Sequence, residues 1–264
     1  MSATPQCDWD PEAYHRFRGL RLRPALDLLA QVPPLPAGAA VDLGCGSGAV
    51  GPALAQRFPG RLLHGVDRSP AMLEEAEATG AYQRLEQADI SEWTAEAPVA
   101  LIFSNAALNW VPGHAELLPR LAGMLAPGGV LAVQSPRQQE APSHRLLREI
   151  SGALYPHLFD WSAWRDDVEE LAEYDRILSG LGELSLWETT YAQLLPPDGR
   201  AHPVRRFTES TAGRRVLDRL AGPETESFLS GYDAELEAHY PRRPDGSVLF
   251  PFRRSFFVLR VPEA

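Results

Sequence analysis

Lysine is absent from the 264-residue sequence, so all 25 of its basic residues are arginines. They are outnumbered by 35 acidic residues, which gives the chain a formal net charge of −10. A nucleic-acid partner needs a concentrated basic surface, whereas adjacent arginines occur here only as pairs, at 205–206, 214–215, 242–243 and 253–254. The absence of lysine also argues against the phosphate-binding loop of nucleotide hydrolases. We therefore expect no nucleic-acid partner.

Cysteine and long apolar runs are scarce as well. The two cysteines, Cys7 and Cys45, are too few for a disulfide framework and lack the spacing of metal ligands. No apolar run approaches the ~20 residues that a membrane-spanning helix needs, and the first residues show no secretion signal. We expect a protein of the cytoplasm that binds neither a metal nor a membrane. The composition leaves the oligomeric state open.

Apolar runs alternate with helical patterns through the first half of the chain, which is typical of βαβ units and a parallel sheet. Ser69 and Pro70 have the residue types preferred at the N-cap and the first position of a helix. Pro127, Gly128 and Gly129 are expected to end the fourth helix. These patterns predict strands at 39–44, 62–67, 82–88, 99–105 and 130–134, and helices at 12–31, 49–58, 69–79 and 114–125.

The second half of the chain is less regular. We expect helices near 143–154 and 166–180, a strand at 184–194, a mostly helical stretch over 203–240 and a last strand at 248–261. The whole chain, 1–264, is predicted to form one α/β domain. An N-terminal lid helix at about 10–31 and a helical cap inserted at about 196–246 are expected to complete it.

A glycine-rich segment, DLGCGSG at 42–48, lies where the first predicted strand turns into a helix. Glycine lets the backbone approach a ligand closely, and open α/β sheets bind ligands at the carboxyl ends of their strands. Such a turn alone is weak evidence, because dinucleotide-binding enzymes carry a glycine-rich turn at the same place. Here, however, the Asp42 carboxylate would repel a pyrophosphate and attract an ammonium group. A bare tight turn without a ligand is the alternative.

Polar residues also follow the next three predicted strands. Asp67 ends the second strand, where an acid can accept hydrogen bonds from both ribose hydroxyls of an adenosine. Asp89 follows the third strand and can accept from an adenine amino group, with Ile90 packed on the ring. Asn105 and Ala106 end the fourth strand and are expected to face the same crevice. Together with Asp42, these positions favour an adenosine cofactor that carries an ammonium group.

This arrangement resembles the class I S-adenosylmethionine-dependent methyltransferases. The resemblance implies a Rossmann-like, seven-stranded, mostly parallel sheet with a reversed last strand. Nearly the whole chain is similar to the trans-aconitate methyltransferase family, and the N-terminal stretch Y-x-x-F-x-x-x-R-x-R-P at 14–24 and the loop N-W-V-P-x-H at 109–114 are its most specific matches. The matching segments, which include these two stretches, are 8–24, 41–48, 65–76, 88–93, 101–114, 125–134, 174–182, 186–191 and 250–260.

The resemblance implies transfer of a methyl group from S-adenosylmethionine to a carboxylate of a small tricarboxylic acid, which gives a monomethyl ester. A carboxylate is already ionised at neutral pH, since its ordinary pKa is about 4, so no catalytic base is required. We therefore predict no catalytic side chain and a reaction driven by positioning. The cofactor-binding residues carried over from the family are Tyr14, Arg21, Asp42, Gly44, Gly46, Asp67, Arg68, Met72, Asp89, Ile90, Asn105 and Ala106.

A polyanionic substrate calls for arginine forks, which bind carboxylates through two parallel hydrogen bonds. Arg253 and Arg254 point to opposite faces of the last strand, and Arg254 occupies the family-like position. His114 is expected to begin a helix, where it either hydrogen-bonds locally or acts as a base. Trp110 either forms a wall of the acceptor pocket or packs in the core. The predicted substrate-binding residues are Tyr14, Trp110, Arg214 and Arg254, with Arg21 and Arg23 as further arginine candidates.

Three other functions remain open at this stage. A methyltransferase of the same fold acting on a hydroxyl, amine or carbon of another metabolite would need a base, for which His114 and Tyr14 are the candidates. A non-catalytic cofactor-binding protein and an NAD-dependent dehydrogenase are less well supported by the acids at 42, 67 and 89. The segments 135–165 and 203–217 follow the family only loosely, so a related acid remains possible as the acceptor.

Overall fold

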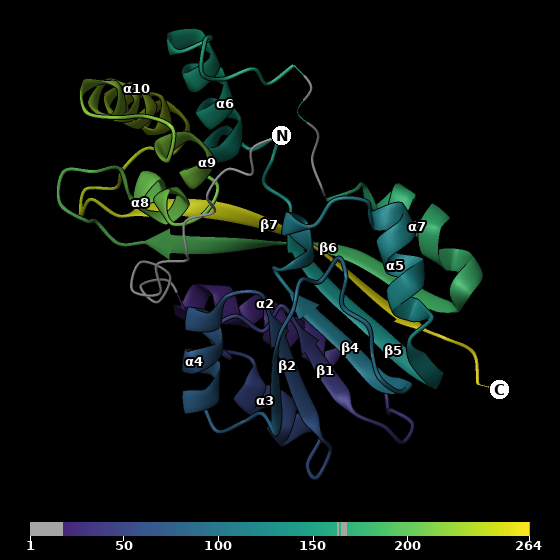
Figure 1. Ribbon diagram of the computed structural model, residues 1–264. Coiled ribbons are helices and arrows are strands. Elements are labelled where there is room, and N and C mark those ends of the chain that lie inside the picture. The colour runs from purple at the N-terminus through teal and green to yellow at the C-terminus, as the bar shows by residue number, and fades with distance from the viewer. Residues whose placement is uncertain (1–17, 163, 165–167, 264) are drawn as a thin grey trace. The chain divides into compact units, whose positions relative to one another are not determined.

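The sheet of this protein has seven strands in the order β3-β2-β1-β4-β5-β7-β6. The computed structural model describes residues 18–162, 164 and 168–263. Figure 1 shows the central strands side by side, with the first half of the chain in purple to teal. The strands are β1 (Ala40–Leu43), β2 (Leu63–Asp67), β3 (Arg84–Gln87), β4 (Val99–Asn105), β5 (Leu125–Pro136), β6 (Glu183–Leu195) and β7 (Val248–Arg260).

Strands β1 to β5 are parallel and β7 is reversed. Every pairing among β1, β2, β3, β4 and β5 is parallel. Along β7 the hydrogen bonds run the other way: Val261 N donates to Gly129 O at 3.0 Å, and Arg137 N donates to Arg253 O at 2.9 Å. As the residue number rises along β5, the number of the paired residue in β7 falls, so β7 is antiparallel to β5. The predicted fold class is therefore confirmed.

The chain divides into two compact units. The first, here called the sheet unit, comprises 1–136, 167–188 and 255–264. The second, the helical unit, comprises 137–166 and 189–254. The predicted cap at 196–246 lies within the helical unit, which also draws on an earlier stretch of the chain. That the chain acts as one methyltransferase domain with a cap stays a prediction.

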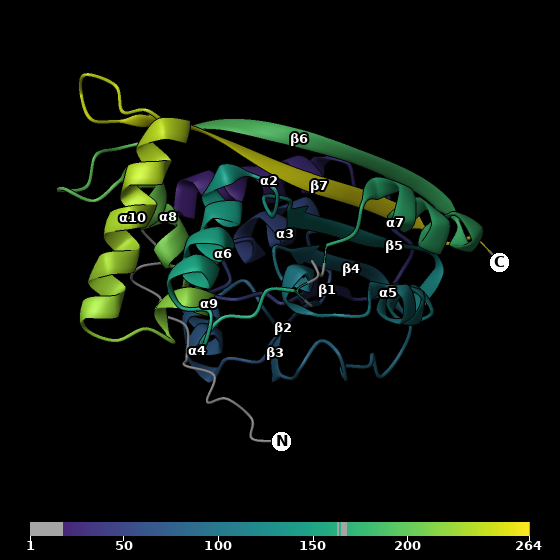
Figure 2. The same ribbon diagram turned by 90° about the horizontal axis from the view of Figure 1, so that it is seen from above.

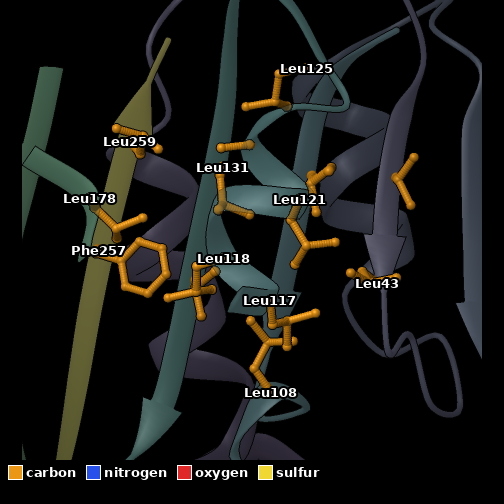
Figure 3. Close-up of a cluster of buried hydrophobic side chains, with 14 of the residues drawn as sticks. Leu43, Leu108, Leu117, Leu118, Leu121, Leu125, Leu131, Leu178, Phe257 and Leu259 are labelled. Atoms are coloured by element: carbon orange, nitrogen blue, oxygen red, sulfur yellow. The ribbon is translucent and has the colours of Figure 1, made fainter. Parts of the chain in front are cut away.

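The core of the sheet unit lies between the strands and the helices α5 and α7. Leu117, Leu118 and Leu121 of α5 recur at helical spacing and form one apolar face. They pack with Leu43 of β1 and Phe257 of β7 (Figure 3). Leu108 of η1 also joins this cluster, whereas α2, α3 and α4 contact the strands outside it. The helices of the unit are α2 (Arg18–Ala30), α3 (Gly51–Arg57), α4 (Pro70–Ala78), η1 (Leu108–Trp110), α5 (His114–Ala122), α7 (Leu171–Leu178) and η2 (Ser179–Leu181).

Local signals set most helix starts but misplaced one helix end. Ser69 caps α4 as predicted, because its side chain accepts a hydrogen bond from Met72 N. The prediction that α5 continues to residue 125 and stops at 127–129 is wrong. The helix ends at Ala122, and residues 127–129 lie inside β5, where the pairing with β4 shifts register between Val99 and Leu101. The proline and glycines form an irregularity in the strand that lets it bend.

The helical unit is built around aromatic side chains. Its helices are α6 (Pro142–Leu154), α8 (Pro203–Glu209), α9 (Arg214–Leu217) and α10 (Pro223–His239), and Figure 2 shows them gathered together. The rings of Phe207, Phe250 and Phe252 lie 5.2–5.5 Å apart between centroids. The Tyr232 hydroxyl of α10 donates to Ser143 O of α6 at 2.5 Å. No helix in the described part of the chain is long and apolar enough to cross a membrane.

Candidate functional site

The loops that follow β1, β2, β3 and β4 line one cavity in the sheet unit. Its empty volume is about 1160 Å³, part of which is open solvent. The carboxyl ends of parallel strands meet at one edge of the sheet, which brings together residues that are far apart in sequence. The predicted site residues that line this cavity are Asp42, Gly44, Gly46, Asp67, Arg68, Met72, Asp89, Ile90, Asn105, Ala106 and Trp110.

The remaining predicted residues lie elsewhere. Tyr14 falls outside the described residues, and Arg21 lies in α2 with a side chain that is not described. Arg214 and Arg254 belong to the helical unit. Their roles, like those of the cavity residues, stay predictions.

Gly44 brings the loop after β1 against the loop after β4. Its φ is +78°, and a Cβ at this position would lie 2.2 Å from the Ala107 Cβ. Only glycine fits here, because a side chain would both strain the backbone and overlap Ala107. The following Gly46 turns its N–H toward β2 and donates to Asp67 Oδ2 at 2.9 Å. The loop after β1 is thus in contact with the loop after β4 at Gly44 and is hydrogen-bonded to Asp67 of β2 at Gly46.

The Asp67 carboxylate is held by two backbone N–H groups. Gly46 N donates to its Oδ2, and Ser69 N donates to its Oδ1 at 2.9 Å. Each carboxylate oxygen has two lone pairs, so each can accept a further hydrogen bond from a ligand. The carboxylate is therefore oriented in advance at the end of β2, as expected for a group that accepts from two hydroxyls.

Asp42 is the most buried acid of the site, with 2% of its surface exposed. Its Oδ2 accepts a hydrogen bond of 2.6 Å from the hydroxyl of Tyr82. Burial raises the pKa of Asp42 to about 7, the Tyr82 hydroxyl opposes this rise, and the nearby Asp67 adds to it. Asp42 therefore changes its charge near neutral pH. Sequence reasoning missed Tyr82, which is 40 residues away and belongs to no motif.

Asp89 has the opposite electrostatic character. Its Oδ1 accepts from the Ser91 hydroxyl at 2.6 Å and from Ser91 N at 2.8 Å. These hydrogen bonds lower the pKa of Asp89, and the charge of Arg68 lowers it further. Asp89 is thus a stable anion at neutral pH. Ile90, beside it, is partly buried and supplies an apolar surface.

Two buried polar atoms of the cavity have no hydrogen-bond partner among the described residues. They are Oδ1 of Asn105, at the end of β4, and Oγ of Ser47, in the glycine-rich loop. Buried polar groups in native proteins are nearly always hydrogen-bonded, so each of these atoms can take up a hydrogen bond with a polar ligand or a water molecule. Ala106, next to Asn105, is the one non-glycine with positive φ, at 54°, among the described residues.

His114 is engaged in structural hydrogen bonds. It begins α5 as predicted and is buried. Its Nε2 donates to Leu108 O at 3.0 Å, and its Nδ1 lies 2.8 Å from the hydroxyl of Tyr174. Both ring nitrogens are thus occupied, and His114 does not line the cavity. This favours the local role over that of a base. Trp110 does line the cavity, from η1.

The arginines of the helical unit differ in their surroundings. Arg254 is buried, with its guanidinium carbon 4.3 Å from the centroid of the Phe252 ring, whereas Arg253 is exposed, as the strand alternation predicts. Arg214 forms an ion pair of 3.6 Å with Asp218. His144 of α6 lies near three arginines. Burial and the charges of Arg148, Arg215 and Arg254 lower its pKa to about 3.

The positive charges around His144 were not anticipated. They concentrate in the same unit as Arg254, and they include Arg215 rather than the predicted Arg214. No group of three or more histidine, cysteine or acidic side chains in the described residues is placed to hold a metal ion.

Comparison with known proteins identifies similar sequences along nearly the whole chain. Residues 40–129 match a family model described as a methyltransferase domain. The trans-aconitate 2-methyltransferase of Methylobacterium nodulans is 42% identical over 256 residues, which cover 96% of this chain and 98% of the relative. The enzyme of the same name from an Azoarcus species is 41% identical, with 95% and 98% covered.

Solved structures show the same fold at lower identity. Phosphoethanolamine N-methyltransferase 2 of Haemonchus contortus, in complex with S-adenosylmethionine, aligns with a TM-score of 0.57 at 18% identity. The alignment covers 96% of this chain and 56% of that protein, so the present chain spans about half of its length.

Proposed function

The chain belongs to the trans-aconitate methyltransferase family, and from this we propose that it transfers the methyl group of S-adenosylmethionine to a carboxylate of trans-aconitate, giving a monomethyl ester. The predicted family, methyltransferase activity and cofactor are confirmed. The choice of trans-aconitate as the acceptor rests on one observation. The chain is about 40% identical to trans-aconitate 2-methyltransferases, over almost the entire length of this chain and of those relatives.

The cavity of the sheet unit fits the cofactor by its chemistry. We propose that Asp42 binds the ammonium group, Asp67 the two ribose hydroxyls and Asp89 the adenine amino group. Met72 and Ile90 supply apolar surface for the adenine ring. The unpartnered oxygens of Asn105 and Ser47 supply further acceptors, and Arg68 borders the cavity. We also retain Tyr14 and Arg21 as cofactor ligands from the N-terminal segment.

Catalysis is proposed to rest on positioning. The sulfonium of the bound cofactor supplies an electrophilic methyl group, and the acceptor carboxylate is ionised at neutral pH without help. The protein then has to hold the two reactants in line and exclude water, which can supply up to ~7–11 kcal/mol of barrier reduction. Trp110 follows the end of β4 and lines the cavity, and we propose that it forms one wall of the acceptor pocket. The occupied nitrogens of His114 are consistent with a reaction that uses no base.

Substrate recognition is assigned to arginines. We propose that Arg254 binds a carboxylate of the acid. Its guanidinium is buried, which costs free energy, and an ion pair with a bound carboxylate would offset that cost. Arg214, which was predicted from the family resemblance, remains a second candidate. The substrate is thus a small polyanion. We further propose that the enzyme works in the cytoplasm without a nucleic-acid or membrane partner.

The proposal is tested by turnover with S-adenosylmethionine labelled in its methyl group. The purified protein is offered a panel of di- and tricarboxylic acids, and the label extracted into product is counted. We expect trans-aconitate to give the highest kcat/KM. Faster turnover of a hydroxyl or amine acceptor would support a same-fold enzyme of another class. Binding without turnover of any acceptor would support a cofactor-binding protein.

Arg254→Ala is expected to raise KM for the acid about tenfold or more, since hydrogen bonds to a charged group contribute about 1.5–3 kcal/mol. Arg253→Ala, on the exposed side of the same strand, is the matched control and should change KM less than twofold. The affinity for S-adenosylhomocysteine, measured by calorimetry, should be the same in both variants. An unchanged KM in folded Arg254→Ala would remove this residue from the substrate site.

A further inference from the structure

Tyr82 lies in a slot that glycines leave open. A Cβ added at Gly51 would be 2.7 Å from the outer atoms of the Tyr82 side chain, and one at Gly65 would be 2.9 Å from its Cδ1. A Cβ at Gly48 would be 3.0 Å from its Cε2. Gly48 and Gly51 come from the loop after β1 and the start of α3, and Gly65 comes from β2. The ring is therefore packed against the backbone of the glycine-rich loop, of α3 and of β2.

The slot directs the phenol hydroxyl at one atom of the cavity wall. The hydroxyl donates to Asp42 Oδ2 over 2.6 Å, the length of a strong hydrogen bond to a charged acceptor. Burial and the charge of Asp42 raise the pKa of Tyr82 well above its usual range, so the hydroxyl keeps its proton. Tyr82 does not itself line the cavity, but it contacts the acid that does.

We propose that Tyr82 is a positioning residue for the amino end of the cofactor: its hydroxyl orients the buried Asp42 carboxylate and favours its ionised form, so that Asp42 binds the cofactor ammonium. This inference rests on the proposed function and deepens it. It adds a residue outside the cavity to the binding of the cofactor, and it makes that binding depend on pH.

The charges around Asp42 give the sign of this dependence. Three titratable groups act on it or respond to it: Tyr82 from the segment before β3, Asp67 from β2 and Cys45 from the glycine-rich loop. Burial and Asp67 raise the pKa of Asp42 and the Tyr82 hydroxyl lowers it, with a balance at about 7. Burial raises the pKa of the Cys45 thiol, which stays neutral. Loss of the hydroxyl removes the one contribution that lowers the pKa of Asp42. The pKa then rises, so Asp42 stays protonated up to a higher pH than in the wild type.

Tyr82→Phe tests the proposal, because it keeps the ring in its slot and removes only the hydroxyl. Tyr155→Phe is the matched control, since the Tyr155 hydroxyl donates to Glu224 O in the helical unit. Affinities are measured by calorimetry at pH 6, 7 and 8 for two ligands. S-adenosylhomocysteine carries the ammonium group, and 5′-methylthioadenosine has the adenosine part without it.

We expect Tyr82→Phe to weaken S-adenosylhomocysteine binding about tenfold at pH 6 and less than threefold at pH 8, as a rise of one pKa unit requires. Binding of methylthioadenosine should be unchanged at every pH, and Tyr155→Phe should match the wild type. In an Asp42→Asn background, where no carboxylate can form, Tyr82→Phe should have no further effect.

Three outcomes would overturn the proposal. Equal losses for both ligands at every pH would mean a purely structural role for Tyr82. Wild-type affinity in Tyr82→Phe would show that the hydroxyl is dispensable, and would leave the proposed function intact. Failure of the wild-type protein to bind S-adenosylhomocysteine would contradict the proposed function and this inference together.

Discussion

Asp67→Ala is expected to weaken S-adenosylhomocysteine binding about a hundredfold or more. Its carboxylate is held by Gly46 N and Ser69 N and is proposed to accept from both ribose hydroxyls. Hydrogen bonds to a charged group contribute about 1.5–3 kcal/mol each, and every 1.4 kcal/mol changes affinity tenfold. The substitution also leaves the Gly46 N–H without its acceptor, so the glycine-rich loop loses one of its hydrogen bonds to β2 and keeps those from Gly44 N and Cys45 N to Val66 O.

The measurement for Asp67 is calorimetric titration, with thermal unfolding to check the fold. Glu74→Ala is the matched control, because this acid is exposed on the neighbouring α4 and does not line the cavity. Asp67→Asn preserves the shape of the side chain, so its affinity for S-adenosylhomocysteine should lie between those of Asp67→Ala and Glu74→Ala. An affinity of Asp67→Ala within threefold of the wild type would exclude Asp67 from the cofactor site.

Gly44→Ala is expected to have the second large effect, on both stability and cofactor binding. A left-handed conformation costs an ordinary residue about 1–2 kcal/mol, and the added Cβ would lie 2.2 Å from the Ala107 Cβ. Relief of this overlap requires the loop after β4 to move, which costs typically 1–3 kcal/mol more. Because that loop carries Asn105 and Ala106, the cavity should change shape and the cofactor should bind more weakly.

Gly60→Ala separates the overlap from the backbone strain. Gly60 has a φ of +75°, nearly that of Gly44, but no atom lies within 4 Å of an added Cβ there. In chemical denaturation, Gly60→Ala should therefore lose only the 1–2 kcal/mol of backbone strain and keep the wild-type affinity for S-adenosylhomocysteine. Equal losses of stability in the two variants would contradict the close contact between Gly44 and Ala107.

Much of the sheet unit could be predicted because its local signals agree with its tertiary environment. The run Val99–Asn105 is apolar because β4 is buried on both faces of a parallel sheet, and the predicted bounds are those observed. Ser69 and Pro70 mark a helix start through their own hydrogen bonding and fixed backbone angle. The positions after β1 to β4 could be grouped because parallel strands end at one edge.

Other features depend on contacts that no local pattern contains. The glycines at 128 and 129 suggested the end of a helix, yet they lie in a strand irregularity that only the pairing with β4 reveals. The sequence of α6 shows that the helix has an apolar face. It does not show that α6 packs on α8 and α10. Tyr82 and Asp42 meet only after β1, β2 and the segment before β3 have come together. Arg214 pairs with Asp218 whereas the charge of Arg215 acts on His144, a difference between adjacent residues that their positions in the sequence do not show.

The most direct test of the account is the nature of the bond that the transferred methyl group forms. The protein is incubated with trans-aconitate and S-adenosylmethionine labelled in its methyl group, and the isolated product is treated with mild alkali. A carboxylate acceptor predicts that alkali releases the label as methanol, because only an ester is hydrolysed under these conditions. A label that stays on the product after alkali would show an ether, amine or carbon acceptor and would contradict carboxyl methylation.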